Sequence, residues 1–311
     1  MLSGLLFDRI APMSKPAVSL QPRRCLRARF RGSECLACVE DCPSGALTLN
    51  GRTISFAEEK CSGCLRCTAI CPNDALTDDL DLEMLLESVT VRRIAVLSCS
   101  KGRQSEGKIK IPCLGFLSES LLAAISTLAG GDVLLDVEPC ADCVNGHCLP
   151  LIKKRLSNIR DRASDHLHVK IRLAFTKDDL PGIDRGTARR FFLKYASEAI
   201  VNIPDKTPSA ASGQAKLPTR NSLGLQVALG KATEPDEKEF LKSFLYELKI
   251  SENCDHCPLC SGMCPTGALK RTKTEKSKQL VFINSRCSGC GICVGFCKKN
   301  ALTLLPGNKR S

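Results

Sequence analysis

Apolar residues in the middle of the chain follow two alternating patterns. Short apolar runs of strand length are separated by longer stretches in which apolar residues recur at helical spacing. The runs are Ile94 to Leu97, Ile109 to Ile111, Val133 to Val137 and Val169 to Phe175, and the helical stretches are Leu117 to Leu128 and Leu149 to Ile159. Strands that alternate with helices are typical of a parallel sheet, so the pattern predicts a small α/β unit over residues 90–180.

Both ends of the chain carry short strand-like segments around turns instead. Leu47 to Phe56 has an Asn50-Gly51 pair at its centre, which predicts a hairpin, and Leu280 to Ile283 reads as the corresponding strand near the C-terminus. Between these regions, Pro204 to Pro235 is rich in Pro, Ser, Ala, Gly and Lys without a sustained period. This composition predicts a linker or a loosely attached strap.

A helix is predicted to follow this linker. Pro235 and the acidic residues after it suit the first turn of a helix, which we expect to run to about Lys249. The basic segment Thr187 to Lys194 predicts an amphipathic helix that packs on another domain or on a partner. Residues 181–249 are therefore assigned to a linker and a helix.

Cysteine is the most informative residue type in the composition. The chain has 21 cysteines among 311 residues, with 2 tyrosines and no tryptophan. Such a content is typical of secreted disulfide scaffolds or of intracellular metal sites, and the odd total and the C-x-x-C spacings favour metal. Leu5 to Phe7 is followed at once by Asp8 and Arg9, too early for an export signal, and no run approaches the roughly 18 apolar residues of a membrane helix. We therefore predict a soluble protein of the reducing cytoplasm, without a membrane span.

A cysteine motif with a short apolar tail occurs four times. The tails are Cys42-Pro-Ser-Gly-Ala-Leu, Cys71-Pro-Asn-Asp-Ala-Leu, Cys264-Pro-Thr-Gly-Ala-Leu and Cys297-Lys-Lys-Asn-Ala-Leu. In the C-terminal pair of motifs, two-residue gaps let one loop present three thiolates to an iron–sulfur cube, and the fourth ligand comes from the partner motif. The two resulting ligand sets are Cys254, Cys257, Cys260 and Cys297 for one cube, and Cys287, Cys290, Cys293 and Cys264 for the other.

These motifs closely resemble the bacterial two-cluster ferredoxin family over residues 250–306, with Lys298 where that family has proline. The N-terminal module, residues 20–80, is similar, but Gly32 stands where the first cysteine belongs, and Cys25 upstream is the obvious substitute. The corresponding ligand sets are Cys25, Cys35, Cys38 and Cys71, and Cys61, Cys64, Cys67 and Cys42. In both modules the small residues after the first cysteine of the later motif, such as Gly63 and Gly289, suit backbone amides that approach sulfur.

Zinc sites and disulfides are the alternatives for these cysteines. Zinc sites also use paired C-x-x-C motifs, but they rarely need three cysteines at two-residue gaps followed by Cys-Pro. The formal charge of +12 would suit a nucleic-acid-binding protein. A [4Fe–4S]²⁺ core on four thiolates carries about −2, however, so four of them would lower the net charge to about +4. Aromatic residues for base stacking are scarce, and we predict no nucleic-acid partner.

Five further cysteines lie in the middle unit, after its successive predicted strands: Cys99, Cys113, Cys140, Cys143 and Cys148. The carboxyl ends of parallel strands share one edge, where ligands bind, so these thiols are expected to converge there. The stretches Ser98-Cys-Ser-Lys-Gly, Ile111-Pro-Cys-Leu-Gly and Glu138-Pro-Cys-Ala-Asp-Cys-Val-Asn-Gly-His147 resemble the iron–sulfur delta subunit of methyl-viologen- and F420-reducing hydrogenases. That resemblance implies a [2Fe–2S] centre on four of the five thiols.

Two other interpretations of the middle cysteines stay open. Some of the five could be buried small hydrophobic residues. Alternatively, Cys140 and Cys143 could form a thiol–disulfide pair fed by the clusters, although no helix is predicted to begin directly after Cys140. His147 is expected to be a loop histidine, with metal ligation or assistance to a thiol as the alternative, and His256 to be a spacer that points outward.

The sequence therefore predicts an α/β and α+β multidomain protein in which two ferredoxin-like 2[4Fe–4S] modules flank a small parallel α/β domain. Its expected function is electron transfer as a polyferredoxin-like subunit of a multi-protein redox complex. The expected partners are redox enzyme subunits: a hydrogenase, a heterodisulfide reductase-like protein or another dehydrogenase. A thiol or disulfide reductase centred on Cys140 and Cys143, and a free polyferredoxin, are the competing hypotheses. We find no glycine-rich dinucleotide loop, P-loop or catalytic triad in the sequence.

Overall fold

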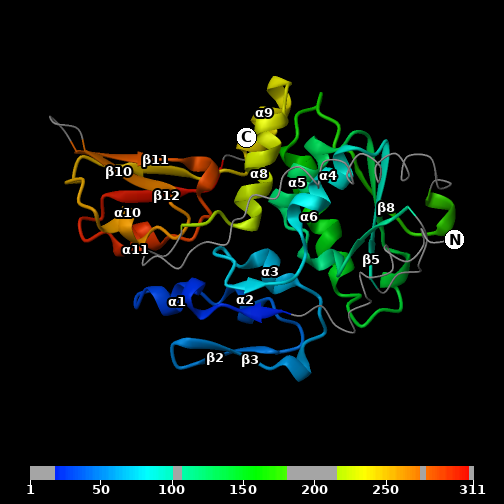
Figure 1. The fold of residues 1–311 in the computed structure, drawn as a ribbon, viewed down its shortest axis with the longest axis horizontal. Coiled ribbons are helices and arrows are strands. Elements are labelled where there is room, and N and C mark those ends of the chain that lie inside the picture. Colours follow the sequence, from blue (N-terminus) through cyan, green and yellow to red (C-terminus); the bar gives the residue numbers. More distant parts are fainter. Residues whose placement is uncertain (1–17, 101–106, 181–215, 274–277, 308–311) are drawn as a thin grey trace, which may run out of the picture.

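The computed structural model describes residues 18–100, 107–180, 216–273 and 278–307 (Figure 1). The N-terminal module is drawn in blue, the middle domain in cyan and green, and the C-terminal module in orange and red, with the yellow helices α8 and α9 between the last two. The predicted basic helix at Thr187 to Lys194 lies outside the described residues. No helix in the described part of the chain is long and apolar enough to span a membrane.

The N-terminal module contains two small antiparallel sheets and three short helices. Its elements are β1 (Ser19–Leu20), α1 (Leu26–Arg29), α2 (Ala37–Glu40), β2 (Leu47–Asn50), β3 (Thr53–Phe56), α3 (Arg66–Ile70) and β4 (Leu76–Thr77). Strand β1 pairs with β4, and β2 pairs with β3 through the register Asn50↔Thr53. Gly51 in the turn has a φ of 59°, a conformation that glycine adopts without a steric penalty. The hairpin predicted from the Asn50-Gly51 pair is confirmed.

The C-terminal module repeats this arrangement. Its elements are β9 (Glu247–Ile250), α10 (Leu259–Met263), β10 (Leu269–Lys273), β11 (Lys278–Phe282), α11 (Ile292–Phe296) and β12 (Leu302–Leu305). Strands β9 and β12 pair as the first and last strands of the module, and β10 and β11 form the central hairpin. The prediction that one helix runs from Pro235 to about Lys249 is wrong in its second half. Helix α9 (Pro235–Lys242) ends early because the following residues pair with β12.

The middle domain is built on a parallel four-stranded sheet in the order β6-β5-β7-β8, as the alternating pattern predicts. Its elements are α4 (Leu82–Thr90), β5 (Ile94–Cys99), β6 (Ile109–Ile111), α5 (Glu119–Leu128), β7 (Asp132–Asp136), α6 (Cys148–Arg162) and β8 (Ile171–Ala174). Helices α4, α5 and α6 lie on the side of the sheet that is nearer to α8 (Figure 1). The chain leaves β5 for β6 at one side and then returns past β5 to β7. Ligands bind at such a switch point in open parallel sheets.

The buried apolar residues divide into a large core and a small one. The large core runs without a break from Leu47 in the N-terminal module through Phe116 and Leu135 in the middle domain to Leu241 in α9. The C-terminal module has its own small core around Leu269. The N-terminal module and the middle domain therefore share buried surface, whereas the C-terminal module packs around a separate centre.

Helix α8 (Arg220–Lys231) occupies part of the segment that the sequence analysis assigns to a linker, so the linker prediction is wrong there. The helix packs against α5 and joins three parts of the molecule. The Arg220 guanidinium donates two hydrogen bonds to the buried Asp78 carboxylate at 2.7 and 3.0 Å, and the Arg220 backbone amide donates to Asp74. The pair with Asp78 anchors the start of α8 to the end of the N-terminal module.

The first turn of α8 is closed by a reciprocal cap between Thr219 and Ser222. We expect Thr219→Ala to lower the free energy of unfolding by about 1 kcal/mol, because the Ser222 backbone amide loses the Thr219 hydroxyl as its acceptor. The thermal midpoint of the anaerobically purified protein measures the effect. Thr233→Ala, an exposed threonine just beyond the end of α8, is the matched control and should leave the midpoint unchanged. Equal effects of the two substitutions would contradict the role of the cap.

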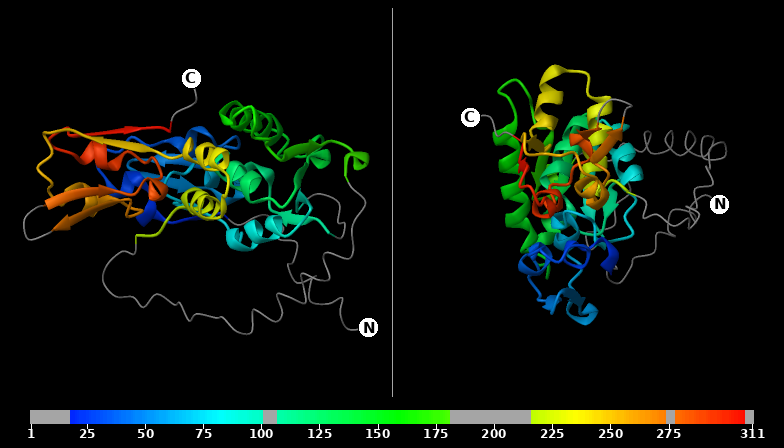
Figure 2. Two further views of the ribbon diagram at one scale, coloured as in Figure 1. Left: turned by 90° about the horizontal axis from the view of Figure 1, so that it is seen from above. Right: turned by 90° about the vertical axis from the view of Figure 1, so that its left-hand side faces the viewer.

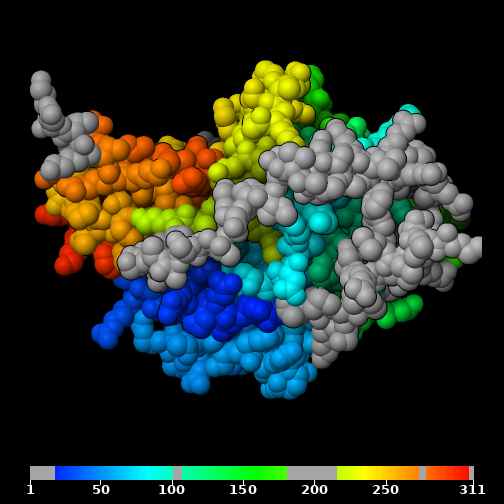
Figure 3. Space-filling view, in the orientation of Figure 1, coloured from blue at the N-terminus to red at the C-terminus, as the bar shows by residue number. Residues whose placement is uncertain are grey.

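The two terminal modules contact one another directly (Figures 2 and 3). The rings of Phe30 and Phe296 meet edge to face with their centroids 5.4 Å apart. Phe30 lies between Cys25 and Cys35, and Phe296 directly precedes Cys297. The contact therefore joins segments that carry predicted ligands in both modules.

Candidate metal centres

The same backbone-to-sulfur hydrogen bonds occur at matching places in the two terminal modules. The amides of Gly63 and Gly289 donate to the Sγ atoms of Cys61 and Cys287, both at 3.4 Å. Two further amides donate to the last cysteine of the later motif: Ala75 to Cys71 at 3.2 Å and Ala301 to Cys297 at 3.4 Å. Such bonds favour the thiolate form and raise the reduction potential of a cluster held by it. The approach of amides predicted at Gly63 and Gly289 is confirmed.

The ligand loops also turn in the same way. Gly63 and Gly289 have φ values of 70° and 72°, and two residues later Leu65 and Gly291 have 57° and 70°. A side chain at such a φ is disfavoured, so leucine at position 65 is tolerated only because it is anchored in the large core. The backbone therefore follows the same course at these positions of the two loops.

Cys25, Cys35, Cys38 and Cys71 are brought together in the N-terminal module. Burial, and after it the neighbouring thiols of Cys71, Cys35 and Cys25, raise the pKa of Cys38 to about 12. Cys25 reaches this position although it precedes the inserted helix α1. The adjacent Arg24 donates from Nε to the Asn73 carbonyl at 2.8 Å, which ties this segment to the loop after Cys71.

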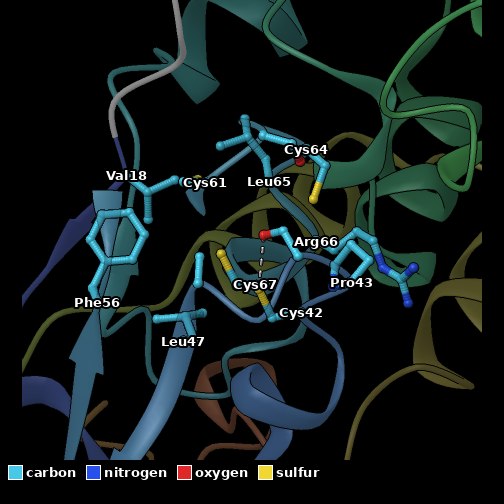
Figure 4. A pocket seen from close by; sticks show the side chains of 13 residues that line it. Val18, Cys42, Pro43, Leu47, Phe56, Cys61, Cys64, Leu65, Arg66 and Cys67 are labelled. Atoms are coloured by element: carbon cyan, nitrogen blue, oxygen red, sulfur yellow. Dashed lines mark hydrogen bonds between the residues drawn. The ribbon is translucent and has the colours of Figure 1, made fainter. Parts of the chain in front are cut away.

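The second group of the module consists of Cys42, Cys61, Cys64 and Cys67, which line one pocket with Leu47 and Phe56 (Figure 4). Burial raises the pKa of Cys67, and Cys64, Cys61 and Cys42 add to the effect. An ion pair between Arg66 and Asp41 links the two segments that supply these cysteines. The pair is mostly buried, so it fixes the position of Cys42 relative to the Cys61–Cys67 loop.

In the C-terminal module the later cysteines lie near Cys264. Burial, and after it the neighbouring thiols of Cys290, Cys287 and Cys264, raise the pKa of Cys293 to about 12. Burial also raises the pKa of Cys260, with Cys257 and Cys254 contributing. Cys297 packs against the same small core as Cys260.

His256 does not behave as the predicted outward-pointing spacer. Its Nδ1 lies 3.9 Å from the Sγ of Cys254, and its carbonyl accepts a hydrogen bond from Arg271 at 2.8 Å. Its φ of 53° turns the loop between Cys254 and Cys257. The ring therefore lies against a predicted ligand.

The sequence matches the family model described as 4Fe-4S dicluster domain over residues 12–75 and 253–301. Both ends of the chain are iron–sulfur electron-transfer domains. No curated protein and no solved structure matches the chain. The two matched regions contain the cysteine motifs from Cys25 to Cys71 and from Cys254 to Cys297.

The donor atoms of these domains suit [4Fe–4S] clusters. Every cysteine of the chain is free of a disulfide, so the gathered sulfurs are available as thiolates. Burial and crowding raise the pKa of most of the shifted thiols, which means that thiolates at these places need a compensating positive charge. Iron supplies this charge, and a bound cluster accepts or releases one electron at a time.

In the middle domain the cysteines that follow successive strands converge at one edge of the sheet, as predicted. Cys99 ends β5, Cys113 lies two residues beyond β6, and Cys140 and Cys143 follow β7. These four thiols and Cys148 line one cavity. Burial, and after it the neighbouring thiols of Cys99, Cys113 and Cys143, raise the pKa of Cys140 to about 12.

A buried carboxylate lies beside this cavity. Asp136, the last residue of β7, accepts hydrogen bonds from the Ser98 hydroxyl at 3.0 Å and from the Lys108 ammonium at 2.8 Å. Ser98 lies on the neighbouring strand β5 and Lys108 directly precedes β6 at the edge of the sheet, so Asp136 links the ends of three strands. These hydrogen bonds therefore fix the strand ends at the edge of the sheet that carries the cysteines.

The hypothesis of a thiol–disulfide pair at Cys140 and Cys143 gains no support. A nucleophilic cysteine needs a lowered pKa, as at the N-terminus of a helix, whereas the pKa of Cys140 is raised. Cys140 lies at the end of a short 3-10 turn (Glu138–Cys140), as expected from the absence of a helix signal after it. The environment suits a metal ligand better than an attacking thiol.

Sequence reasoning missed a contact between the middle domain and the N-terminal module. His147 and Cys148, at the start of α6, lie against Cys64, so His147 is not an ordinary loop histidine. Hydrogen bonding from Cys148 lowers the pKa of Cys64 to about 5. The Asn145 side chain donates to the Ser62 carbonyl at 3.1 Å across 83 residues of sequence. The only local signal for this contact is Gly115, two residues after Cys113, whose lack of a side chain permits the close approach.

Proposed function

We propose that the protein is an electron-transfer subunit of a multi-protein redox complex, in which sixteen cysteines hold four [4Fe–4S] clusters and the middle domain holds a [2Fe–2S] cluster. The matched amide-to-sulfur bonds in the two modules support the [4Fe–4S] part of the proposal. The convergence of cysteines at the carboxyl edge of the parallel sheet supports the middle centre.

The ligand sets proposed for the four [4Fe–4S] clusters are those that the motif spacing predicts. For the middle centre we assign Cys99, Cys113, Cys140 and Cys143, because these four line one cavity and Cys140 has the other three as neighbours. Such a set has the four thiolates that a [2Fe–2S] cluster needs. The delta subunits of methyl-viologen- and F420-reducing hydrogenases, which the middle sequence resembles, are the basis for expecting a hydrogenase, a heterodisulfide reductase-like protein or another dehydrogenase as partner.

The middle centre is tested by Mössbauer and EPR spectroscopy of the full-length protein purified without oxygen. We expect a [2Fe–2S] signature in addition to the [4Fe–4S] signals, and Cys99→Ser should perturb or remove that signature alone. Cys264→Ser is the matched control, because it should perturb a [4Fe–4S] signal and leave the [2Fe–2S] signature intact. A full-length protein with complete [4Fe–4S] loading and no [2Fe–2S] signature would contradict this part of the proposal.

Membership of a complex is tested by purification of the tagged full-length protein from its own cells. A partner of fixed stoichiometry that carries flavin, nickel or molybdenum is the expected result. A fully loaded protein that elutes alone at every ionic strength would favour the free polyferredoxin instead.

A further inference from the structure

A buried group of sulfur and imidazole atoms lies where the middle domain meets the N-terminal module. The ligand-type atoms of Cys64, His147 and Cys148 all lie within 4.8 Å of one another. Cys148 is 1% exposed and is the first residue of α6. Because Cys64 belongs to a proposed [4Fe–4S] ligand set, a side chain of the middle domain lies directly against a ligand of the N-terminal module.

Cys148 also contacts the ligand set of the middle domain. Cys64, Cys113 and Cys148 form one buried cluster, with Cys148 interacting with both of the other two. There is no free space at this point. A Cβ atom at Gly115 would lie 2.2 Å from the Cys64 carbonyl oxygen and 2.9 Å from the Cys148 sulfur. The two ligand sets are thus separated by a single thiol.

The neighbours of Cys148 set it apart from the other middle cysteines. All five thiols line one cavity, but the Cys148 sulfur also lies within 4.8 Å of the Cys64 sulfur in the N-terminal module. Four thiolates complete a [2Fe–2S] cluster, so a fifth is not needed as a ligand. A thiol that keeps its hydrogen can instead donate a weak hydrogen bond.

We propose that Cys148 is not a ligand but a sulfur bridge that joins Cys64 of the N-terminal module to Cys113 of the middle site. The inference rests on the proposed [2Fe–2S] centre. The thiol has one hydrogen and can turn it toward either ligand sulfur, and the sulfur of the more reduced centre is the better acceptor. Cys148 would therefore stabilise an added electron on either side of the junction.

This arrangement makes the junction a route for a single electron. When the electron moves, one centre is oxidised by one unit and the other is reduced by one unit. No covalent bond forms or breaks, and the Cys148 thiol keeps its proton. Cys148 acts as a positioning residue, because it contacts the ligand sulfurs and not the metal.

The test compares the redox potentials of both centres in Cys148→Ala and Cys148→Ser. We expect both variants to retain the iron content and the [2Fe–2S] and [4Fe–4S] spectra of the unaltered protein. In Cys148→Ala the midpoint potentials of the middle centre and of one [4Fe–4S] centre, each taken while the other centre is oxidised, should both fall, because each reduced centre loses the hydrogen-bond donor to its ligand sulfur. In Cys148→Ser the hydroxyl should move both potentials back toward those of the unaltered protein. Leu151→Ala, elsewhere on α6, is the packing control and should move neither potential.

Several results would overturn the bridge. Loss of the middle iron in Cys148→Ala, as in Cys99→Ala, would make Cys148 a ligand. One zinc per chain that disappears in the same variant would make Cys64, His147 and Cys148 a zinc site. A shift at one centre alone, or at neither, would also overturn it. Should Cys148→Ala fail to fold, Cys148→Val, which also removes the donor but fills the space of the thiol, takes its place under the same expectations. These failures are distinguishable from failure of the proposed function, for which the unaltered protein itself would lack the [2Fe–2S] signature.

Discussion

Replacement of Cys25 by alanine should remove one N-terminal [4Fe–4S] cluster, or convert it to a three-iron form, and leave the other centres intact. Cys25 is the proposed ligand with the weakest motif support, because Gly32 stands at the position that the spacing predicts. In the structure Cys25 nevertheless joins Cys35, Cys38 and Cys71. A cube with three remaining thiolates has one iron without a protein ligand, and such an iron is readily lost.

Iron quantitation and EPR of the anaerobically purified protein measure this effect. Cys254→Ala is the matched control, because Cys254 holds the equivalent position in the C-terminal module and follows the family spacing. Both variants should lose the same amount of iron, and the oxidised protein should show a three-iron signal in each if the cubes are converted. A Cys25→Ala protein with all four [4Fe–4S] clusters would remove Cys25 from the ligand set.

Substitution of Gly115 by alanine should destabilise the contact between the middle domain and the N-terminal module. The new Cβ would lie 2.2 Å from the backbone oxygen of Cys64, a distance that real Cβ atoms do not show, and the backbone there cannot swing aside as a side chain can. Overpacking of this kind costs about 1–3 kcal/mol in the free energy of unfolding. We therefore expect a lower thermal midpoint and a shifted signal from the centre that includes Cys64.

Gly230→Ala is the control for Gly115→Ala. Gly230 lies in α8, and nothing approaches within 4 Å of the position that its Cβ would occupy. Alanine is favoured over glycine in helices by about 1 kcal/mol, so this substitution should leave stability unchanged or raise it. A stability loss in Gly230→Ala equal to that in Gly115→Ala would mean that the contact with Cys64 is not the cause.

The features that sequence reasoning predicted best are those set by local spacing. A two-residue gap between cysteines fixes which thiols share a loop, and the Asn50-Gly51 pair determines a hairpin without any distant partner. The parallel sheet followed from short apolar runs between helical stretches. Convergence of the cysteines at one edge then follows from the topology of parallel strands.

The features that were missed depend on distant partners. Helix α8 contains two glycines, which disfavour a helix locally, yet Gly224 lies against Leu121 of α5, where a Cβ would be 3.3 Å from the leucine side chain. The helix forms because tertiary packing and the Arg220–Asp78 pair outweigh its weak propensity. Helix α9 ends before the predicted residue because β12 pairs with the segment after it. The contact of His147 and Cys148 with Cys64 likewise leaves no trace in the spacing of either motif.

The division into two cores has a consequence for how the protein is assembled in the cell. Cys64 and Cys113 meet in the buried interior that the N-terminal module shares with the middle domain, so the final shape of the two proposed metal sites depends on residues from both. We therefore expect cluster insertion into the N-terminal module to be coupled to folding of the middle domain during synthesis. The C-terminal module, around its own small core, contains all the cysteines of both its proposed ligand sets. We therefore expect it to acquire its clusters independently of the rest of the chain.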